Sequence, residues 1–216
     1  MAQAARGLQA RRLAGYESRI MKASPRVTMS NRKAWGLAYF AAFIACIPAA
    51  NWMIGHAGVV CLPNGPCLVP VWPWGSHGPL MAPSGVVMAG LALVLRDLVQ
   101  RRLGRHVALM SIVAGAALSG AVAPPQLVVA SAAAFFLSEL ADFAVYTPLA
   151  ARGLVRAVLA SSMVGLVADS VLFLWLAFGS LEFLAGQIVG KAWTVLLALP
   201  VIHWIRGRET ASDIAS

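Results

Sequence analysis

Two carboxylates stand three residues apart in an otherwise apolar stretch, "FFLSELADFAVYTPLAARG", residues 135–153. They are Glu139 and Asp142, and a spacing of three places both side chains on one face of a helix. A carboxylate at bilayer depth is costly unless it is compensated, so such residues usually face a bundle interior and mark a ligand or ion path. This pair is therefore our first candidate for a binding site.

Further polar side chains recur inside other apolar segments. Asp169 lies midway along "SSMVGLVADSVLF", Gln187 and Lys191 are four residues apart in "GQIVGKAW", and Asn51 lies near the end of the first apolar segment. One interpretation is a set of substrate contacts. The other is a structural ion pair in which Lys191 neutralises Asp169 or Glu139, and the two interpretations are compatible.

No catalytic motif accompanies these groups. The sequence lacks the HExxH, Gly-x-Ser-x-Gly and P-loop patterns, and no histidine in the same segment is placed to activate Ser138. Asp142 and Asp169 do not stand in the motif that an intramembrane aspartic protease needs. We therefore expect a protein that is not an enzyme, with no cofactor and no metal site.

The elements that must position these groups are membrane spans. Hydrophobic residues make up 60% of the 216 residues, charged residues only 12%, and the mean hydropathy is +0.77. A soluble domain is nearer half apolar and a quarter charged. Segments of about 20 apolar residues cross a bilayer, and the sequence predicts an all-α polytopic bundle of six of them: 34–54, 80–101, 106–122, 125–146, 157–179 and 184–205.

The distribution of basic residues predicts the topology. Eight of the 17 Lys and Arg residues precede residue 34, and the connections 101–106 and 147–156 and the C-terminal end carry seven more. The connections 55–79, 123–124 and 180–183 carry none, so the positive-inside rule places both termini in the cytoplasm. We expect a basic N-terminal arm (1–33) that contacts anionic lipid or sets topology, a transmembrane domain (34–206) and a short tail (207–216).

The cysteines fit this topology. Cys61 and Cys67 flank a Leu-Pro-Asn-Gly-Pro turn in the connection predicted to face the oxidising side, and a disulfide between them is the favoured interpretation. A metal site using His56 or His77 is the alternative.

Four ordered motifs resemble the VUT family, the queuosine precursor transporters. They are "APSGVVMAGLALVLRDLVQRRLG" (82–104), "SELADFAVYTPL" (138–149), "VADSVLFLWLAFG" (167–179) and "GQIVGKAW" (186–193). The resemblance implies a six-helix importer of the bacterial cytoplasmic membrane. Its substrates would be 7-cyano-7-deazaguanine, 7-aminomethyl-7-deazaguanine or queuine, salvaged for tRNA modification. It also implies likeness to the substrate-binding components of energy-coupling-factor transporters.

Carried over motif by motif, the resemblance assigns Arg96, Asp97 and Gln100 to the signature of the second helix. Glu139 and Asp142 match the acidic pair of the fourth helix, Asp169 the Asp-Ser of the fifth, and Gln187 and Lys191 the motif of the sixth.

The residues at the end of the second span predict a gate or a structural role rather than a base contact. We expect Arg96 to extend toward the lipid headgroups. We expect Asp97 to pair with Arg101 or with a cation on another helix.

The chemistry of the acidic pair suits a guanine-type edge, since a carboxylate can accept both of its adjacent N–H donors. Phe135, Phe143, Trp175 or Trp193 could supply a π-face. The alternative to a self-sufficient transporter is a substrate-binding membrane subunit that needs a separate ATPase module, and an intramembrane enzyme is the third reading. The expected partners are a deazapurine base and the lipid bilayer but no nucleic acid, with a homodimer left open.

Overall fold

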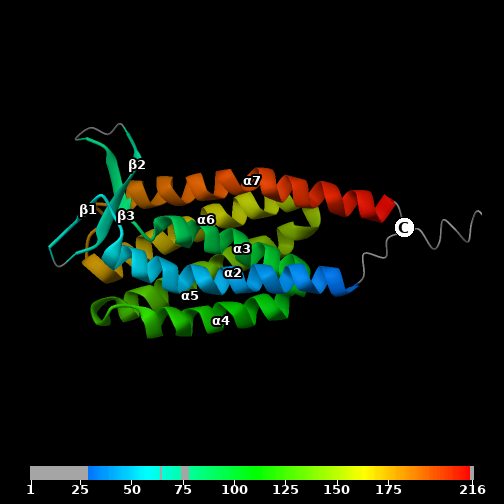
Figure 1. The fold of residues 1–216 in the computed structure, drawn as a ribbon, viewed down its shortest axis with the longest axis horizontal. Coiled ribbons are helices and arrows are strands. Elements are labelled where there is room, and N and C mark those ends of the chain that lie inside the picture. The colour runs from blue at the N-terminus through cyan, green and yellow to red at the C-terminus, as the bar shows by residue number, and fades with distance from the viewer. Residues whose placement is uncertain (1–28, 64, 74–77, 215–216) are drawn as a thin grey trace, which may run out of the picture.

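The computed structural model describes residues 29–63, 65–73 and 78–214, and the side chains of 33–63, 65–73 and 78–205. Six long helices in this part of the chain run lengthwise through the molecule, and a small sheet covers one end (Figure 1). The start of the first helix and the end of the last both lie at the opposite end. We call these the sheet end and the terminal end. The helices are α2 (Met29–His56), α3 (Val86–Leu103), α4 (Arg105–Val122), α5 (Val128–Leu149), α6 (Leu154–Phe178) and α7 (Leu184–Ile214).

Five of these helices, all except α3, are long and apolar enough to cross a membrane, which confirms the prediction of an all-α polytopic membrane protein. The helix α3 carries Arg96, Asp97, Arg101 and Arg102 within its 18 residues. It is nevertheless buried along most of its length, and it packs against α2, α4, α5, α6 and α7. The other helices thus surround the part of α3 that carries Arg96 and Asp97, which keeps these two charges away from lipid.

The helix boundaries differ most from the predicted spans in three places. Residues 80–85, predicted to begin the second span, form strand β3 (Leu80–Pro83) and a turn, and α3 starts only at Val86. Pro83 explains this, because proline disfavours helical geometry in the residue before it. The helix α2 begins at Met29, inside the predicted arm, and α7 extends through most of the predicted tail. Residues 1–28 of the arm lie outside the described residues.

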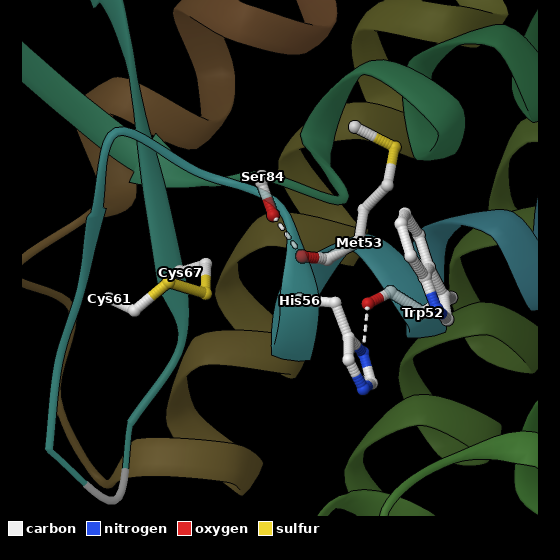
Figure 2. Close-up of a disulfide and its surroundings, with 6 residues drawn as sticks. All are labelled: Trp52, Met53, His56, Cys61, Cys67 and Ser84. Carbon is white, nitrogen blue, oxygen red and sulfur yellow. Dashed lines mark hydrogen bonds between the residues drawn. A yellow bond between two sulfur atoms is a disulfide. The ribbon is translucent and has the colours of Figure 1, made fainter.

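The connection between α2 and α3, predicted only as a loop, contains a three-stranded antiparallel sheet in the order β1-β2-β3. The strands are β1 (Val60–Cys61), β2 (Cys67–Trp72) and β3. Cys61 pairs with Cys67 in the register of the first two strands, and a disulfide joins the same two residues (Figure 2). The covalent link closes the short hairpin at the edge of the sheet.

The corner between β3 and α3 is held against the end of α2. The hydroxyl of Ser84 donates a hydrogen bond of 2.6 Å to the carbonyl of Met53, as Figure 2 shows, and the amide of Ser84 donates one of 2.9 Å to the carbonyl of Cys67. The first turn of α3 is therefore fixed to both the sheet and α2, close to the cavity described below.

Gly186 is the point at which α7 approaches β3 most closely. A Cβ atom built on Gly186 would lie 1.9 Å from the carbonyl oxygen of Met81, whereas one built on Gly55 in α2 would meet nothing within 4 Å. We expect Gly186→Ala to lower the free energy of unfolding by about 1–3 kcal/mol, because backbone must move to admit the methyl group. Gly55→Ala is the matched control, and it should leave stability unchanged or raise it by up to about 1 kcal/mol. Equal melting temperatures for both variants would contradict this contact.

Candidate functional site

A cavity lies among the helices in the half of the bundle nearer the sheet. All six long helices and β3 contribute to its wall. The cavity measures about 90 Å³ on the scale on which one water molecule needs ~10–15 Å³, so it has room for a small ligand. Most of the wall is apolar. The polar side chains on it are Asn51, Ser119, Ser131, Ser138, Glu139, Asp169 and Gln187.

Four of the six predicted substrate contacts meet at this cavity, each from a different helix. They are Asn51 of α2, Glu139 of α5, Asp169 of α6 and Gln187 of α7. Asp142 and Lys191, predicted as further contacts, are not on the wall, and each is paired with another residue of the bundle. Of the acidic pair in α5, Glu139 is therefore the member that reaches the cavity.

The two amide side chains on the wall, Asn51 and Gln187, differ in whether their polar atoms have hydrogen-bond partners. One of the two N–H donors on Nδ2 of Asn51 bonds the carbonyl of Ile47 at 3.1 Å, and its Oδ1 atom accepts from the hydroxyl of Ser131 at 3.4 Å. Gln187 is 3% exposed, and its Oε1 atom has no hydrogen-bond partner among the described residues. A buried acceptor without a donor costs about 1–3 kcal/mol. Gln187 thus has unused capacity to accept a hydrogen bond.

Behind Glu139 lies a cluster of charges around Arg96, whose side chain is 0% exposed. Its Nε atom donates to Oε2 of Glu139 at 3.1 Å, its Nη1 atom lies 3.0 Å from Oδ1 of Asp97, and its Nη2 atom forms an ion pair with Oδ1 of Asp142. We call Arg96, Asp97, Glu139 and Asp142 the Arg96 cluster. Because Glu139 also lines the cavity, the cluster and the cavity share one side chain.

Neutral groups complete the surroundings of the Arg96 cluster. Arg96 Nη1 donates to Oε1 of Gln100 at 3.1 Å, and Nε2 of Gln100 donates in turn to the hydroxyl of Thr147 at 3.0 Å. The hydroxyl of Ser161 donates to Oδ2 of Asp97 at 3.1 Å. These bonds connect α3 with α5 and α6, so the signature residues of α3 hold the bundle together.

The prediction that Arg96 extends toward the headgroups is wrong. The side chain turns into the bundle, where its guanidinium carbon lies 5.9 Å from the ring centre of Phe143 and 5.7 Å from that of Tyr146. In the bundle, three carboxylates offset the hydration that the guanidinium of Arg96 loses on burial. A single phosphate contact at the membrane surface would not provide as many ion pairs. Asp97 accordingly has its ion partner in the adjacent Arg96.

A second buried ion pair lies between α6 and α7. Nζ of Lys191 is 2.5 Å from Oδ2 of Asp169 and 2.9 Å from the hydroxyl of Ser170, while the hydroxyl of Ser138 donates to Oδ1 of Asp169 at 3.4 Å. Of the two carboxylates proposed as partners for Lys191, the structure thus pairs it with Asp169. Asp169 also lies on the cavity wall, so the pair is both structural and available to a ligand.

Two aromatic rings line the cavity, Phe135 of α5 and Phe173 of α6. Of the other rings proposed as a π-face, Phe143 lies beside Arg96, and Trp193 stacks on Trp72 of the sheet. The sequence reasoning missed Phe173. It is four residues after Asp169, on the same face of α6, and this spacing was the signal that could have identified it.

The described part of the chain contains no group of three or more His, Cys, Asp or Glu residues that could hold a metal ion. His56 stacks on Trp52, and its Nδ1 atom lies 2.9 Å from the carbonyl of Trp52 (Figure 2). His77, the other residue of the alternative metal site, lies outside the described residues. The two cysteines of that alternative are joined in the disulfide.

A family model described as "Putative vitamin uptake transporter" matches residues 121–205. The matched segment runs from the end of α4 through the membrane part of α7. It therefore includes Glu139, Asp142, Asp169, Gln187 and Lys191, whereas α2 and α3 precede it. No curated protein and no solved structure shows a significant match to the chain. Residues 121–205 of this multi-pass membrane protein are thus similar to the putative vitamin uptake transporter family, which agrees with the resemblance seen in the motifs of that segment.

Proposed function

We propose that this transporter imports a 7-deazaguanine base, a precursor of queuosine, across the bacterial cytoplasmic membrane. The observation that carries the proposal is Glu139, a buried carboxylate that lines the cavity while Arg96 holds one of its oxygens. An apolar cavity with a few fixed polar groups is the usual form of a small-molecule site. The motifs of the family resemblance supply the class of ligand.

Glu139 suits a guanine-type edge because the acceptors of its carboxylate match the hydrogen-bond donors of that edge. Such an edge presents two adjacent N–H donors and a carbonyl, whereas an ionised carboxylate is acceptor-only and can take both donors. Adenine presents a different order of donors and acceptors, so it would leave buried groups unpaired at a cost of about 1–3 kcal/mol each. Glu139 therefore favours guanine-type over adenine-type rings.

The other side chains on the cavity wall suit a flat ligand that carries several N–H donors. Oε1 of Gln187 has no partner in the described structure and can accept from a ring N–H on another edge of the base. One N–H donor of Asn51 already bonds the carbonyl of Ile47, so Asn51 is better placed to orient Ser131 than to bind the base alone. Phe135 and Phe173 supply apolar ring surface for stacking.

The second candidate is a substrate-binding subunit that works only with an ATPase module. It is favoured by the lack of a P-loop pattern, because the chain cannot then hydrolyse nucleotide by itself through that motif. Reconstituting the purified chain alone in liposomes and measuring uptake of labelled 7-cyano-7-deazaguanine separates the two. We expect uptake by the chain alone. Binding without uptake would favour the subunit, and absence of binding would reject the ligand class.

The distribution of basic residues places the sheet end outside the cell. Val59 near the sheet is 74% exposed, and Arg105 lies exposed at the terminal end. In a chain whose Cys61 and Cys67 are both replaced by serine, Val59→Cys should react with a membrane-impermeant thiol reagent added to intact cells, and Arg105→Cys should not. Labelling of Arg105→Cys alone would reverse the orientation.

A further inference from the structure

The Arg96 cluster holds more negative than positive charge in a fully buried place. The guanidinium of Arg96 faces three carboxylates, those of Asp97, Glu139 and Asp142, and none of the four side chains is more than 2% exposed. Ionised throughout, the cluster would carry two uncompensated negative charges. Charges without partners are strongly disfavoured in such surroundings, and the usual outcome is that the group takes up a proton.

Charged and titratable groups on neighbouring helices do not remove this excess. Tyr146, on α5, is neutral in its ordinary form and lies beside Arg96. Asp169 on α6 and Lys191 on α7 pair with each other and so cancel. On the cavity side of the cluster α2 contributes Cys46, which carries no charge as a thiol. Arg101, one turn after Asp97 on α3, is partly exposed rather than buried with the cluster, so the excess is carried by the buried groups of the cluster.

The surroundings of one Asp142 oxygen give a second observation, independent of the count of charges. Asp142 is 0% exposed, and its Oδ2 atom has no hydrogen-bond partner among the described residues. On that side the chain presents Gly165 of α6, where an added Cβ would lie 3.1 Å from Oδ2. The cation that pairs with Asp142, Arg96, lies at the other oxygen, Oδ1. A carboxyl group in such a place is far better tolerated in its neutral form.

A proton fits the cluster better than other cations. The carboxylates surround Arg96 rather than a vacant centre, and none of the described acidic groups has an arrangement suited to a metal ion. A positively charged ligand in the cavity could reach Glu139 but not Asp97 or Asp142, which are not on the cavity wall. A proton needs no space and can pass from the cavity to Asp142 through Glu139.

We propose that the Arg96 cluster is a proton-binding site, and that Glu139, which belongs to both cluster and cavity, couples its proton to import of the ligand. A hydronium ion in the cavity donates the proton and becomes water as an O–H bond forms on Glu139 or Asp142. When the bundle opens to the other side of the membrane, that O–H bond breaks, the carboxylate is restored and the proton leaves on a water molecule as hydronium. The coupling rests on the proposed function. When the N–H donors of the base stabilise Glu139 as a carboxylate, the proton resides on Asp142.

The bound proton can be tested without any ligand. A protonated carboxyl group has a characteristic C=O stretch in the infrared, which the purified protein should show in neutral buffer. Asp142→Asn should remove or shift this band. Glu182→Gln, which changes an exposed acid in the turn before α7, is the matched control and should leave it in place. If Asp142→Asn does not fold, Glu139→Gln serves as the second variant. Absence of the band in the native protein would overturn the proposal.

The coupling is tested in proteoliposomes with 7-cyano-7-deazaguanine, whose substituent carries no amine that titrates. Acid on the side of the sheet end should raise net uptake several-fold, and a protonophore should abolish the rise. Asp142→Asn should lose the response to pH, whereas the control Glu182→Gln should keep both that response and the exchange of labelled for unlabelled base, which needs no net proton movement. Exchange that continues without any effect of the pH gradient would overturn the coupling. Absence of exchange with the infrared band present would instead reject the proposed function and leave the proton site standing.

Discussion

Replacing Arg96 by methionine is expected to lower the free energy of unfolding by about 3–5 kcal/mol, because it leaves three buried carboxylates without their shared cation. The expected result in detergent is a large fall in melting temperature or loss of a monodisperse protein. Arg105→Met is the matched control, since Arg105 is exposed at the start of α4. We expect little change for it.

Arg96→Lys refines this prediction. Lysine keeps the positive charge, but it lacks the planar fork by which Arg96 reaches Asp97, Glu139, Asp142 and Gln100 from three nitrogen atoms. An intermediate melting temperature is therefore expected. If Arg96→Met were as stable as the native protein, the cluster would not be what holds α3 to α5.

Replacing Glu139 by glutamine is expected to weaken base binding about 10- to 150-fold, which corresponds to about 1.5–3 kcal/mol for a hydrogen-bonded contact to a charged group. The amide keeps the size of the side chain but offers the base one acceptor and one donor in place of two acceptors. Its oxygen can still accept from Nε of Arg96, and the cluster loses one of its excess negative charges. Stability should therefore be largely retained. The measurement is equilibrium binding together with the melting temperature.

Asp142→Asn is the comparison for this prediction, because Asp142 also pairs with Arg96 but does not line the cavity. Its effect on affinity should be smaller than that of Glu139→Gln. Equal losses in both variants would mean that the cluster acts on binding as a unit rather than through Glu139. A fall in melting temperature for Glu139→Gln with intact binding would favour a purely structural role.

The sequence was sufficient for the features that depend on local spacing. Six apolar segments of spanning length predicted six helices, and the three-residue spacing of Glu139 and Asp142 correctly placed both on one face, which the structure turns toward Arg96. The disulfide between Cys61 and Cys67 was also predicted, from two cysteines with only five residues between them on either side of a turn. In each case the residues concerned lie close to one another in the sequence.

Contacts between distant segments could not be predicted in this way. Arg96 and Glu139 are 43 positions apart, and nothing in the spacing of α3 shows that its arginine turns inward rather than toward the headgroups. The choice depends on whether other helices bring enough carboxylates to replace hydration, which is a property of the packed bundle. For the same reason the sequence could not tell which of Glu139 and Asp142 reaches the cavity. The sheet at residues 60–83 was missed because its strands are short and irregular.

We propose that this cavity holds a 7-deazaguanine base through Glu139. Titration of the purified protein with 7-cyano-7-deazaguanine, 7-aminomethyl-7-deazaguanine, queuine and adenine, repeated with Glu139→Gln, tests this binding. We expect saturable binding of at least one deazaguanine, much weaker binding of adenine, and a 10- to 150-fold loss of deazaguanine affinity in the variant. Binding of no deazaguanine, or equal affinity of the native protein and the variant for the base that binds, would contradict the account.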